Sequence, residues 1–195
     1  KGKKIKRPQE GKLEPLKCSM LPLDYEITED SDIRIIQIAG ANAQYYRMLW
    51  THNFVGSQAT YNRAVLIDGY VAAVFGISKM ASDSIFVWYV MKAPHKLYRL
   101  GRLCYMLAQN QSFVDTLLDD IDQEKVTKMR TAMLTKYAEN KEVRGIMKLV
   151  NRQEDAKNGY KLTYEAALAA GRDEKATLAE WLRREKQWQQ KRAQQ

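Results

Sequence analysis

The stretch WTHNFVGSQ, residues 50–58, contains His52, one of only two histidines in the chain. A histidine side chain has a pKa of about 6.5, so it can accept or release a proton at neutral pH. His52 is therefore a candidate general acid or base. A histidine beside Phe54 could equally be a hydrogen-bonded core residue, and the sequence leaves both interpretations open.

Basic residues are concentrated at the two ends of the chain. Of the formal net charge of +9, residues 1–17 contribute +5 and residues 172–195 contribute +3. A basic arm can bind nucleic acid because each neutralised phosphate releases counterions, although a solvated tail has the same composition. Arg183 and Arg184 lie on the basic face of a helix predicted over 176–195, where they could contact phosphates. The opposite face is more typical of packing and holds Leu178, Trp181, Leu182, Glu185 and Trp188.

Hydrophobic periodicity predicts the elements that must position these groups. A hairpin is predicted over 63–79, because Asp68-Gly69 separates two apolar runs and both residues tolerate positive φ. Leucines recur at helical spacing over 96–118, as one long helix or two joined near Asn110. The other predicted elements are strands over 31–39, 83–93, 128–138 and 159–168 and helices over 41–50 and 140–150.

The composition indicates one folded domain with appendages. Residues 1–17 combine lysines with Pro8, Gly11 and Pro15 and are predicted to be a flexible basic arm; residues 18–170 form the domain, and 171–195 a C-terminal amphipathic helix. No apolar run approaches the roughly 18 residues of a membrane span, and Cys18 and Cys104 lack a C-x-x-C spacing. We therefore expect a soluble, cytoplasmic protein with no membrane partner and no cysteine-rich metal site, although His52 could join a dispersed one.

The predicted order, with a hairpin before a strand and then a long helix, resembles the GCN5-related N-acetyltransferase (GNAT) fold over about residues 30–168. This resemblance implies an α+β architecture, a mixed central sheet flanked by helices. In that family, backbone N–H groups at the start of the helix after the fourth strand bind the pyrophosphate of acyl-CoA. The equivalent stretch here is APHKLYRLGRL, which makes Tyr98, Arg99, Gly101 and Arg102 the cofactor-binding candidates.

Three stretches, WTHNFVGS, APHKLYRLGRLCY and TAMLTKYAENKEVRGIMKLVNRQE, stand in order ahead of GYKLTYEAAL. This arrangement resembles the phage Mom-like DNA-modification proteins over roughly residues 45–168. That family is associated with carbamoylmethylation of the exocyclic N6 of adenine, which shields phage DNA from restriction. The resemblance implies a transferase that acts on double-stranded DNA in the host cytoplasm.

The same resemblance implies roles for particular residues. His52, Lys136 and Tyr137 would be catalytic, and Lys141 and Arg144 would bind nucleic acid. The adenine must leave the base stack to react, so exposed aromatic rings should receive it. The stacking candidates are Tyr46, Trp50, Tyr61 and Trp88, and His95 would approach the site from a strand end. For each of these residues, core packing or a solvated surface is the alternative.

The donor of the transferred group is not specified by the sequence. Acetyl-CoA is the usual donor of the fold, but Tyr98 and Leu103 depart from the family's phosphate-loop pattern. A glycine-derived donor such as a charged tRNA is the other hypothesis, which would make tRNA a second partner. Two rival functions also remain: an acyl-CoA-dependent N-acetyltransferase acting on a small amine or protein, and a noncatalytic DNA-binding anti-restriction protein.

Overall fold

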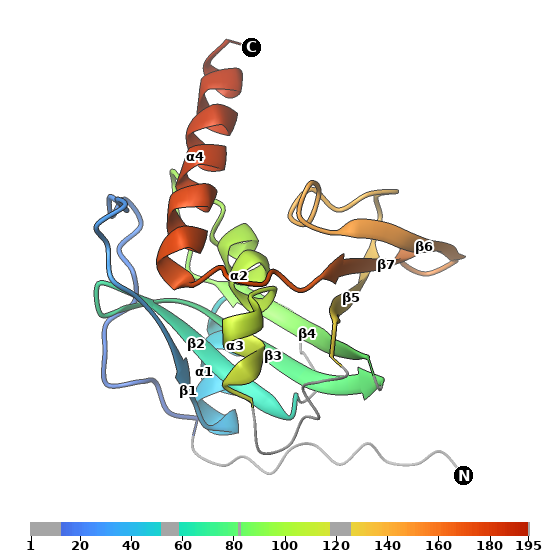
Figure 1. Ribbon diagram of the computed structural model, residues 1–195, viewed down its shortest axis with the longest axis horizontal. Coiled ribbons are helices and arrows are strands. Elements are labelled where there is room, and N and C mark those ends of the chain that lie inside the picture. Colours follow the sequence, from blue (N-terminus) through green and yellow to red (C-terminus); the bar gives the residue numbers. More distant parts are fainter. Residues whose placement is uncertain (1–12, 52–58, 82, 118–125, 195) are drawn as a thin grey trace.

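The computed structural model describes residues 13–51, 59–81, 83–117 and 126–194, and it is organised around one seven-stranded sheet (Figure 1). The strand order is β1-β2-β3-β4-β5-β7-β6, with β4 and β5 parallel and all other neighbours antiparallel. Helices pack on both faces, so the predicted mixed sheet with flanking helices is confirmed. The strands are β1 (Ile33–Gln37), β2 (Tyr61–Ile67), β3 (Tyr70–Ala81), β4 (Ser84–Lys92), β5 (Lys128–Thr135), β6 (Lys148–Asp155) and β7 (Gly159–Ala167).

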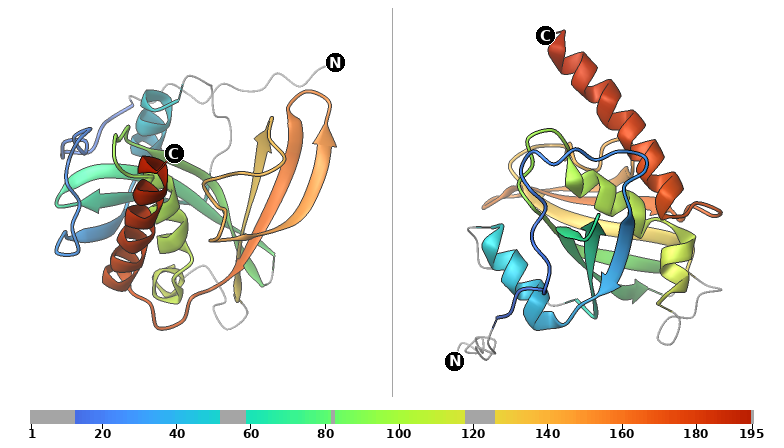
Figure 2. Two further views of the ribbon diagram at one scale, coloured as in Figure 1. Left: turned by 90° about the horizontal axis from the view of Figure 1, so that it is seen from above. Right: turned by 90° about the vertical axis from the view of Figure 1, so that its left-hand side faces the viewer.

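The helices cover mainly the β1–β4 half of the sheet. The helix α1 (Gly40–Leu49) packs on β2 and β3 from one side, and α2 (Leu100–Ala108) packs on β3 and β4 from the other. The short helix α3 (Gln111–Asp115) follows α2, and α4 (Glu174–Ala193) packs on α2 and β1. The C-terminal end of α4 projects away from the body of the molecule (Figure 2).

The hairpin between β2 and β3 is confirmed at the predicted turn. Asp68 and Gly69 both adopt positive φ, 50° and 83°, which are the angles that such a two-residue turn requires. The long helical segment is also resolved: it forms two helices, with the break at Asn110. The side chain of Asn110 is fully buried and donates to Thr177 Oγ1 of α4 at 2.7 Å, which joins the break to the last helix.

A bulge in β4 lies where β4 and β5 separate. Tyr89 pairs with Gly76 and Val87 with Ile77, so Trp88 is an extra residue on β4. Any side chain at position 76 would collide with the ring of Tyr89, so glycine is required there. The parallel pairing with β5 ends at Val87 and Thr131, although both strands continue further. The sheet therefore has a gap between the C-terminal ends of β4 and β5.

The predicted helix over 140–150 is wrong. Residues 136–147 form turns closed by a bridge between Arg144 and Met147, and Gly145 has a φ of 74°, which is incompatible with a right-handed helix. The chain then enters β6, a strand that the sequence prediction lacked. The strand predicted over 128–138 ends at Thr135, where these turns begin.

The predictions for the two ends differ in outcome. Residues 1–12 of the predicted arm lie outside the described residues, but the rest of that arm is held against α1: the backbone N–H of Leu16 donates to the hydroxyl of Tyr46, and Asn42 donates to the carbonyl of Glu14. The C-terminal helix forms as predicted. Among the described residues, no helix is both long and apolar enough to cross a membrane.

Candidate active site

A groove of about 790 Å³ opens at the C-terminal end of β5, beside the gap in the sheet. Three of the residues singled out from the sequence, Tyr137, Lys141 and Arg144, contribute to its lining. Lys136 precedes Tyr137 and is exposed, but it is not among the lining residues. The groove is lined by Thr135, Tyr137, Ala138, Glu139, Asn140, Lys141, Glu142, Arg144 and Arg152.

The turns that form the groove are held by specific hydrogen bonds. The backbone N–H of Asn140 donates to the hydroxyl of Tyr164 at 2.8 Å, and its side-chain oxygen accepts from the N–H of Glu142 at 2.7 Å. Because Asn140 links the segment to the buried Tyr164 of β7, the groove has one fixed wall. A polar loop with these bonds can present side chains in a defined arrangement.

The groove carries more positive than negative side chains. Arg144 pairs with Glu139 at 2.6 Å, and both side chains are more than half exposed to solvent. Tyr137 is 75% exposed, which leaves its phenol group accessible. Arg152 stands on β6 opposite the core residue Leu162, and its side chain has no ion-pair partner among the described residues. Two guanidinium groups, a lysine and a phenol can bind an anion such as phosphate and can donate or accept a proton.

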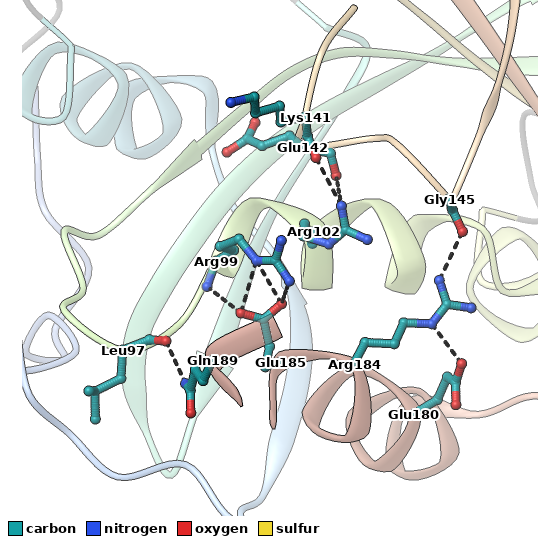
Figure 3. A network of polar contacts seen from close by, with 10 residues as sticks. All are labelled: Leu97, Arg99, Arg102, Lys141, Glu142, Gly145, Glu180, Arg184, Glu185 and Gln189. Carbon is teal, nitrogen blue, oxygen red and sulfur yellow. Dashed lines mark hydrogen bonds and ion pairs between the residues drawn. The ribbon is translucent and has the colours of Figure 1, made fainter. Parts of the chain in front are cut away.

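The N-terminus of α2 is occupied by a carboxylate from α4 (Figure 3). Glu185 is completely buried and accepts hydrogen bonds from the backbone N–H of Arg99 at 3.0 Å and from its guanidinium at 2.8 Å. The indole of Trp188 lies 4.0 Å from the guanidinium carbon of the same arginine. The backbone donor that a helix start offers to an anion is thus already used within the chain.

A second carboxylate lies over the first turn of α2. A Cβ placed on Gly101 would lie 2.6 Å from Oε1 of Glu142, so the glycine leaves room for that side chain. Glu142 also forms an ion pair with Lys92 at the end of β4. Arg102 is buried and donates to the carbonyls of Lys141 and Glu142 at 2.9 and 3.1 Å, and burial lowers the pKa of its guanidinium.

These contacts bear directly on the cofactor that the fold resemblance implies. Arg99, Gly101 and Arg102 lie at the start of α2 as predicted, but they hold Glu185, Glu142 and a loop instead of presenting free donors. A diphosphate would meet two carboxylates at this position, and like charges repel each other. Acyl-CoA bound through the N-terminus of α2 therefore does not fit the residues present.

Two further predicted residues have structural roles. The hydroxyl of Tyr98 donates to the carbonyl of Ile27 at 3.2 Å. Nδ1 of His95 accepts from the backbone N–H groups of Leu97 and Tyr98, at 3.1 and 3.3 Å, so Nε2 carries the proton and donates to the carbonyl of Tyr25. Burial lowers the pKa of His95 and favours this neutral form. His95 stabilises the turn before α2 and is not part of the groove lining, which corrects its predicted place in the site.

The predicted stacking residues separate into buried and exposed rings. Tyr46 is 1% exposed and packs between Tyr45 and Trp50, with ring centroids 5.1 and 4.9 Å away, so it is a core residue and cannot receive a base. Trp50 is half-buried in the same cluster, and Tyr61 is half-buried against the other core. Trp88, at 37% exposure, is the aromatic candidate with a substantial accessible face.

The two candidate arginines of α4 contact a carboxylate of the same helix. Arg183 and Arg184 both donate to Glu180. Arg184 also donates to the carbonyl of Gly145 at 2.9 Å (Figure 3). These hydrogen bonds lower the pKa of Glu180 to about 2. The side chain of Arg183 keeps 56% of its surface exposed, whereas Arg184 ties α4 to the loop that forms the groove.

His52 lies outside the described residues, and its role stays a prediction. Sequence reasoning missed Arg152, and it did not assign Glu142 or Glu185 to the start of α2. For Arg152 a signal existed, because Asn158-Gly159 is a hairpin dipeptide and would have placed a strand before it. For the two glutamates no local signal exists, since their partners lie 41 and 86 residues away in the chain.

Comparison with known proteins identifies the family. No curated protein sequence matches the chain. Among solved structures, the Campylobacter jejuni N-acetyltransferase PseH in complex with acetyl-CoA shares 7% identity at a TM-score of 0.46, over 70% of this chain and 99% of that one. Ard1 from Thermoplasma volcanium shares 10% sequence identity at a TM-score of 0.44, over 70% of this chain and 98% of its own. An acetyl-CoA-bound GNAT family acetyltransferase from Elizabethkingia anophelis shares 8% sequence identity at a TM-score of 0.46, over 70% of this chain and 98% of its own.

A family model described as the phage GNAT-like domain matches residues 30–186. This match extends from three residues before β1 through most of α4, so it includes the sheet, the groove and the carboxylate of Glu185. The chain therefore belongs to the phage GNAT-like family.

Proposed function

We propose that the protein is a phage GNAT-like transferase that adds a small, carbamoylmethyl-like group to the N6 of adenine in DNA and thereby protects that DNA from restriction. The observation that carries the proposal is the convergence of Tyr137, Lys141 and Arg144 on one groove beside the gap in the sheet. The Mom-like resemblance selected these three residues without reference to the groove. Arg152 adds a further cation to the same lining.

The chemistry required at such a site is a proton transfer coupled to bond formation. The N6 amine is a poor nucleophile, so it must lose a proton as its bond to the transferred carbon forms. The bond between that carbon and the donor's leaving group breaks at the same time, and its electron pair leaves with the donor. In this proposal His52 or Tyr137 receives the proton and Lys136 stabilises charge nearby, while Lys141, Arg144 and Arg152 hold phosphate groups.

The filled N-terminus of α2 supports a donor other than acyl-CoA. Glu185 and Glu142 occupy the place where the fold resemblance would put a diphosphate. A glycine-derived donor such as a charged tRNA would not need that place, because its phosphates could be bound by the cationic groove. Arg183 of α4 offers a further exposed cation to either nucleic acid.

An acyl-CoA-dependent N-acetyltransferase acting on a small amine or protein is the second candidate. The gap between β4 and β5 favours it, because an elongated donor could enter the sheet there even if its phosphates were bound elsewhere. This function requires measurable binding of acetyl-CoA and no dependence on DNA. The two candidates therefore differ in a direct test.

The test is mass spectrometry of nucleosides from the DNA of cells that express the intact protein, His52→Ala or Tyr137→Phe. We expect a new adenine-derived mass with the intact protein, at least 10-fold less of it with either variant, and full yield with Tyr70→Phe, which changes a tyrosine in the β1–β4 half. Unmodified nucleosides from cells containing soluble protein would overturn the proposal. Saturable binding of acetyl-CoA by that protein would then support the second candidate.

A further inference from the structure

One face of the β5–β7–β6 part of the sheet is left uncovered by the described helices. The helix α1 packs on β2 and β3, α2 on β3 and β4, and α4 on α2 and β1, so none of them packs extensively on β5, β6 or β7 (Figure 2). The turns over 136–147 lie on the α2 side, because Val143 is in the core and Glu142 touches Gly101. The face on the other side is called the outer face below.

Strand register identifies the side chains of the outer face. Arg130, Glu165 and Lys148 stand opposite one another on β5, β7 and β6, and Arg130 donates to Glu165 at 2.7 Å. Four residues further along β5 and on the same face, Leu134 is 60% exposed and stands opposite Lys161. Side chains two apart in a strand share a face, so these residues form one continuous surface.

Trp88 extends this surface across the gap to β4. Phe86 stands beside Arg130 in the parallel register, and its ring centroid lies 4.6 Å from that of Trp88. Because pairing ends one residue before Trp88, the exposed indole lies at the rim of the gap between β4 and β5. The groove with Tyr137 lies on the α2 side at the C-terminal end of β5, and its lining residue Glu142 pairs with Lys92 at the end of β4.

Charge separates this part of the chain from the rest of the domain. Residues 128–167 hold nine Lys or Arg against five Asp or Glu, a formal charge of +4, whereas the rest of the stretch 18–171 carries −3. Lys128 and Arg130 both pair with Glu165. Lys148 and Lys161 are exposed and form no ion pair within the described residues. A basic surface that includes a flat aromatic ring is suited to a phosphate backbone with accessible bases.

We propose that the outer face binds a single-stranded stretch of nucleic acid, with Lys148 and Lys161 on its phosphates and one base stacked on Trp88. The inference rests on the proposed function and deepens it, because it names the surface that holds the DNA strand around the target adenine. A base displaced from its duplex would approach the gap from this face. The groove residues would meet it from the other side.

The test is fluorescence anisotropy of a labelled single-stranded oligonucleotide titrated with the full chain. We expect the double variant Lys148→Glu/Lys161→Glu to weaken binding at least 10-fold and to reduce the slope of log affinity against log salt by about 1 to 2. Trp88→Ala should weaken binding about 10-fold, and Trp88→Phe should restore most of it, because base stacking needs only an aromatic face. The matched control is Lys96→Glu/Lys175→Glu, a reversal of two exposed lysines outside β5–β7, which should change affinity less than 2-fold.

The outcomes separate this inference from the proposed function. The inference would be overturned if the control and outer-face variants lost affinity for the oligonucleotide equally, or if Trp88→Ala left that affinity unchanged. Tighter binding to an intact duplex than to the single strand would also overturn it. If oligonucleotide binding depends on the outer face but no modified nucleoside is found, the proposed function fails and the inference stands. If Lys148→Glu/Lys161→Glu still modifies DNA at the full rate, the inference fails and the proposed function stands. Circular dichroism and urea unfolding of each variant establish that it is folded.

Discussion

The two halves of the sheet are built differently although they share one set of strands. In the β1–β4 half, Val74 and Phe75 are neighbours in sequence on opposite faces of β3, and both are completely buried because α1 and α2 cover the two sides. In the β5–β7 half, buried and exposed residues alternate, as Leu162 and Lys161 do on β7. One half therefore supplies most of the hydrophobic stability, and the other keeps surface available for ligands.

The sequences of the strands account for this difference. The stretch VAAVFGI in β3 is apolar at every position, as expected for a strand between two covered faces. The strands β5 and β7, KMRTAMLT and GYKLTYEAA, place their charged residues on one face only. A sheet with one solvated face tolerates basic residues there at little cost in folding free energy.

The largest expected effect is the difference between two large-to-small substitutions. Phe75→Ala should lower the free energy of unfolding by about 3 to 5 kcal/mol, because it leaves a cavity in the core. Leu134→Ala, on the outer face, should change it by no more than about 0.5 kcal/mol. Urea unfolding followed by circular dichroism measures both. Similar losses from the two variants would show that the outer face is covered in solution.

The second effect concerns two glutamates on α4. Glu185→Ala removes a buried carboxylate from Arg99, whose side chain is 27% exposed. We expect the free energy of unfolding to fall by about 2 to 3 kcal/mol, which is less than for a fully buried pair because water partly solvates the arginine. Glu180→Ala should lower stability by at most about 1 kcal/mol, because Arg183 and Arg184 remain hydrated. Unfolding measured for both variants at the same salt concentration provides the comparison. Equal effects would contradict the role of Glu185 as an internal anion at α2.

The third effect is a pH dependence that originates in the β1–β4 half. The folded-state pKa of His95 is lowered by burial, so the unfolded chain binds the proton more readily. The stability that His95 contributes is present above about pH 6.5 and is lost as the pH falls through its folded-state pKa. We expect the loss to be below about 1 kcal/mol because the ring is only half-buried. Comparing unfolding of the intact protein and His95→Gln at pH 7.5 and 5.5 measures it; an equal pH dependence of the two would refute it.

The smallest effect on stability, and the clearest chemical readout, comes from the two cysteines. Burial raises the pKa of Cys104 to about 12, and its side chain is 1% exposed, whereas Cys18 is half-buried. At pH 8 a disulfide reagent should label one thiol in the folded protein, two in urea and none in folded Cys18→Ser. Labelling of Cys104 in the folded state would show that the α2 side opens readily.

Sequence reasoning succeeded where short-range chemistry determines structure. Asp68-Gly69 specified its hairpin because both residues adopt positive φ, and the leucine spacing specified α2 and the helical segment beyond Asn110. It failed at residues 140–150, where helix-compatible residues are overridden by the positive φ of Gly145 and by pairing of the following strand with β7. A strand that forms through tertiary pairing leaves a weak local signal.

The candidate site shows the same limit. Sequence reasoning assigned Tyr137, Lys141 and Arg144 to one site, and all three line the groove because they are close in the chain. It treated Arg99 and Arg102 as free phosphate ligands, because nothing near them in the sequence shows that Glu185 and the carbonyls of residues 141 and 142 are their partners. The donors of a helix start can be predicted locally, but whether they are already used depends on contacts between distant segments.

The two edges of the sheet also differ, and this difference affects how the molecule behaves at high concentration. The edge at β1 lies against α4, whereas β6 forms the opposite edge and, within the described part of the chain, pairs only with β7. An unpaired edge strand is a template on which another chain can add a strand and begin to aggregate. In the segment KLVNRQED, Lys148, Arg152, Glu154 and Asp155 would have to be desolvated by an added strand. The charges on β6 thus protect the sheet from growing beyond seven strands.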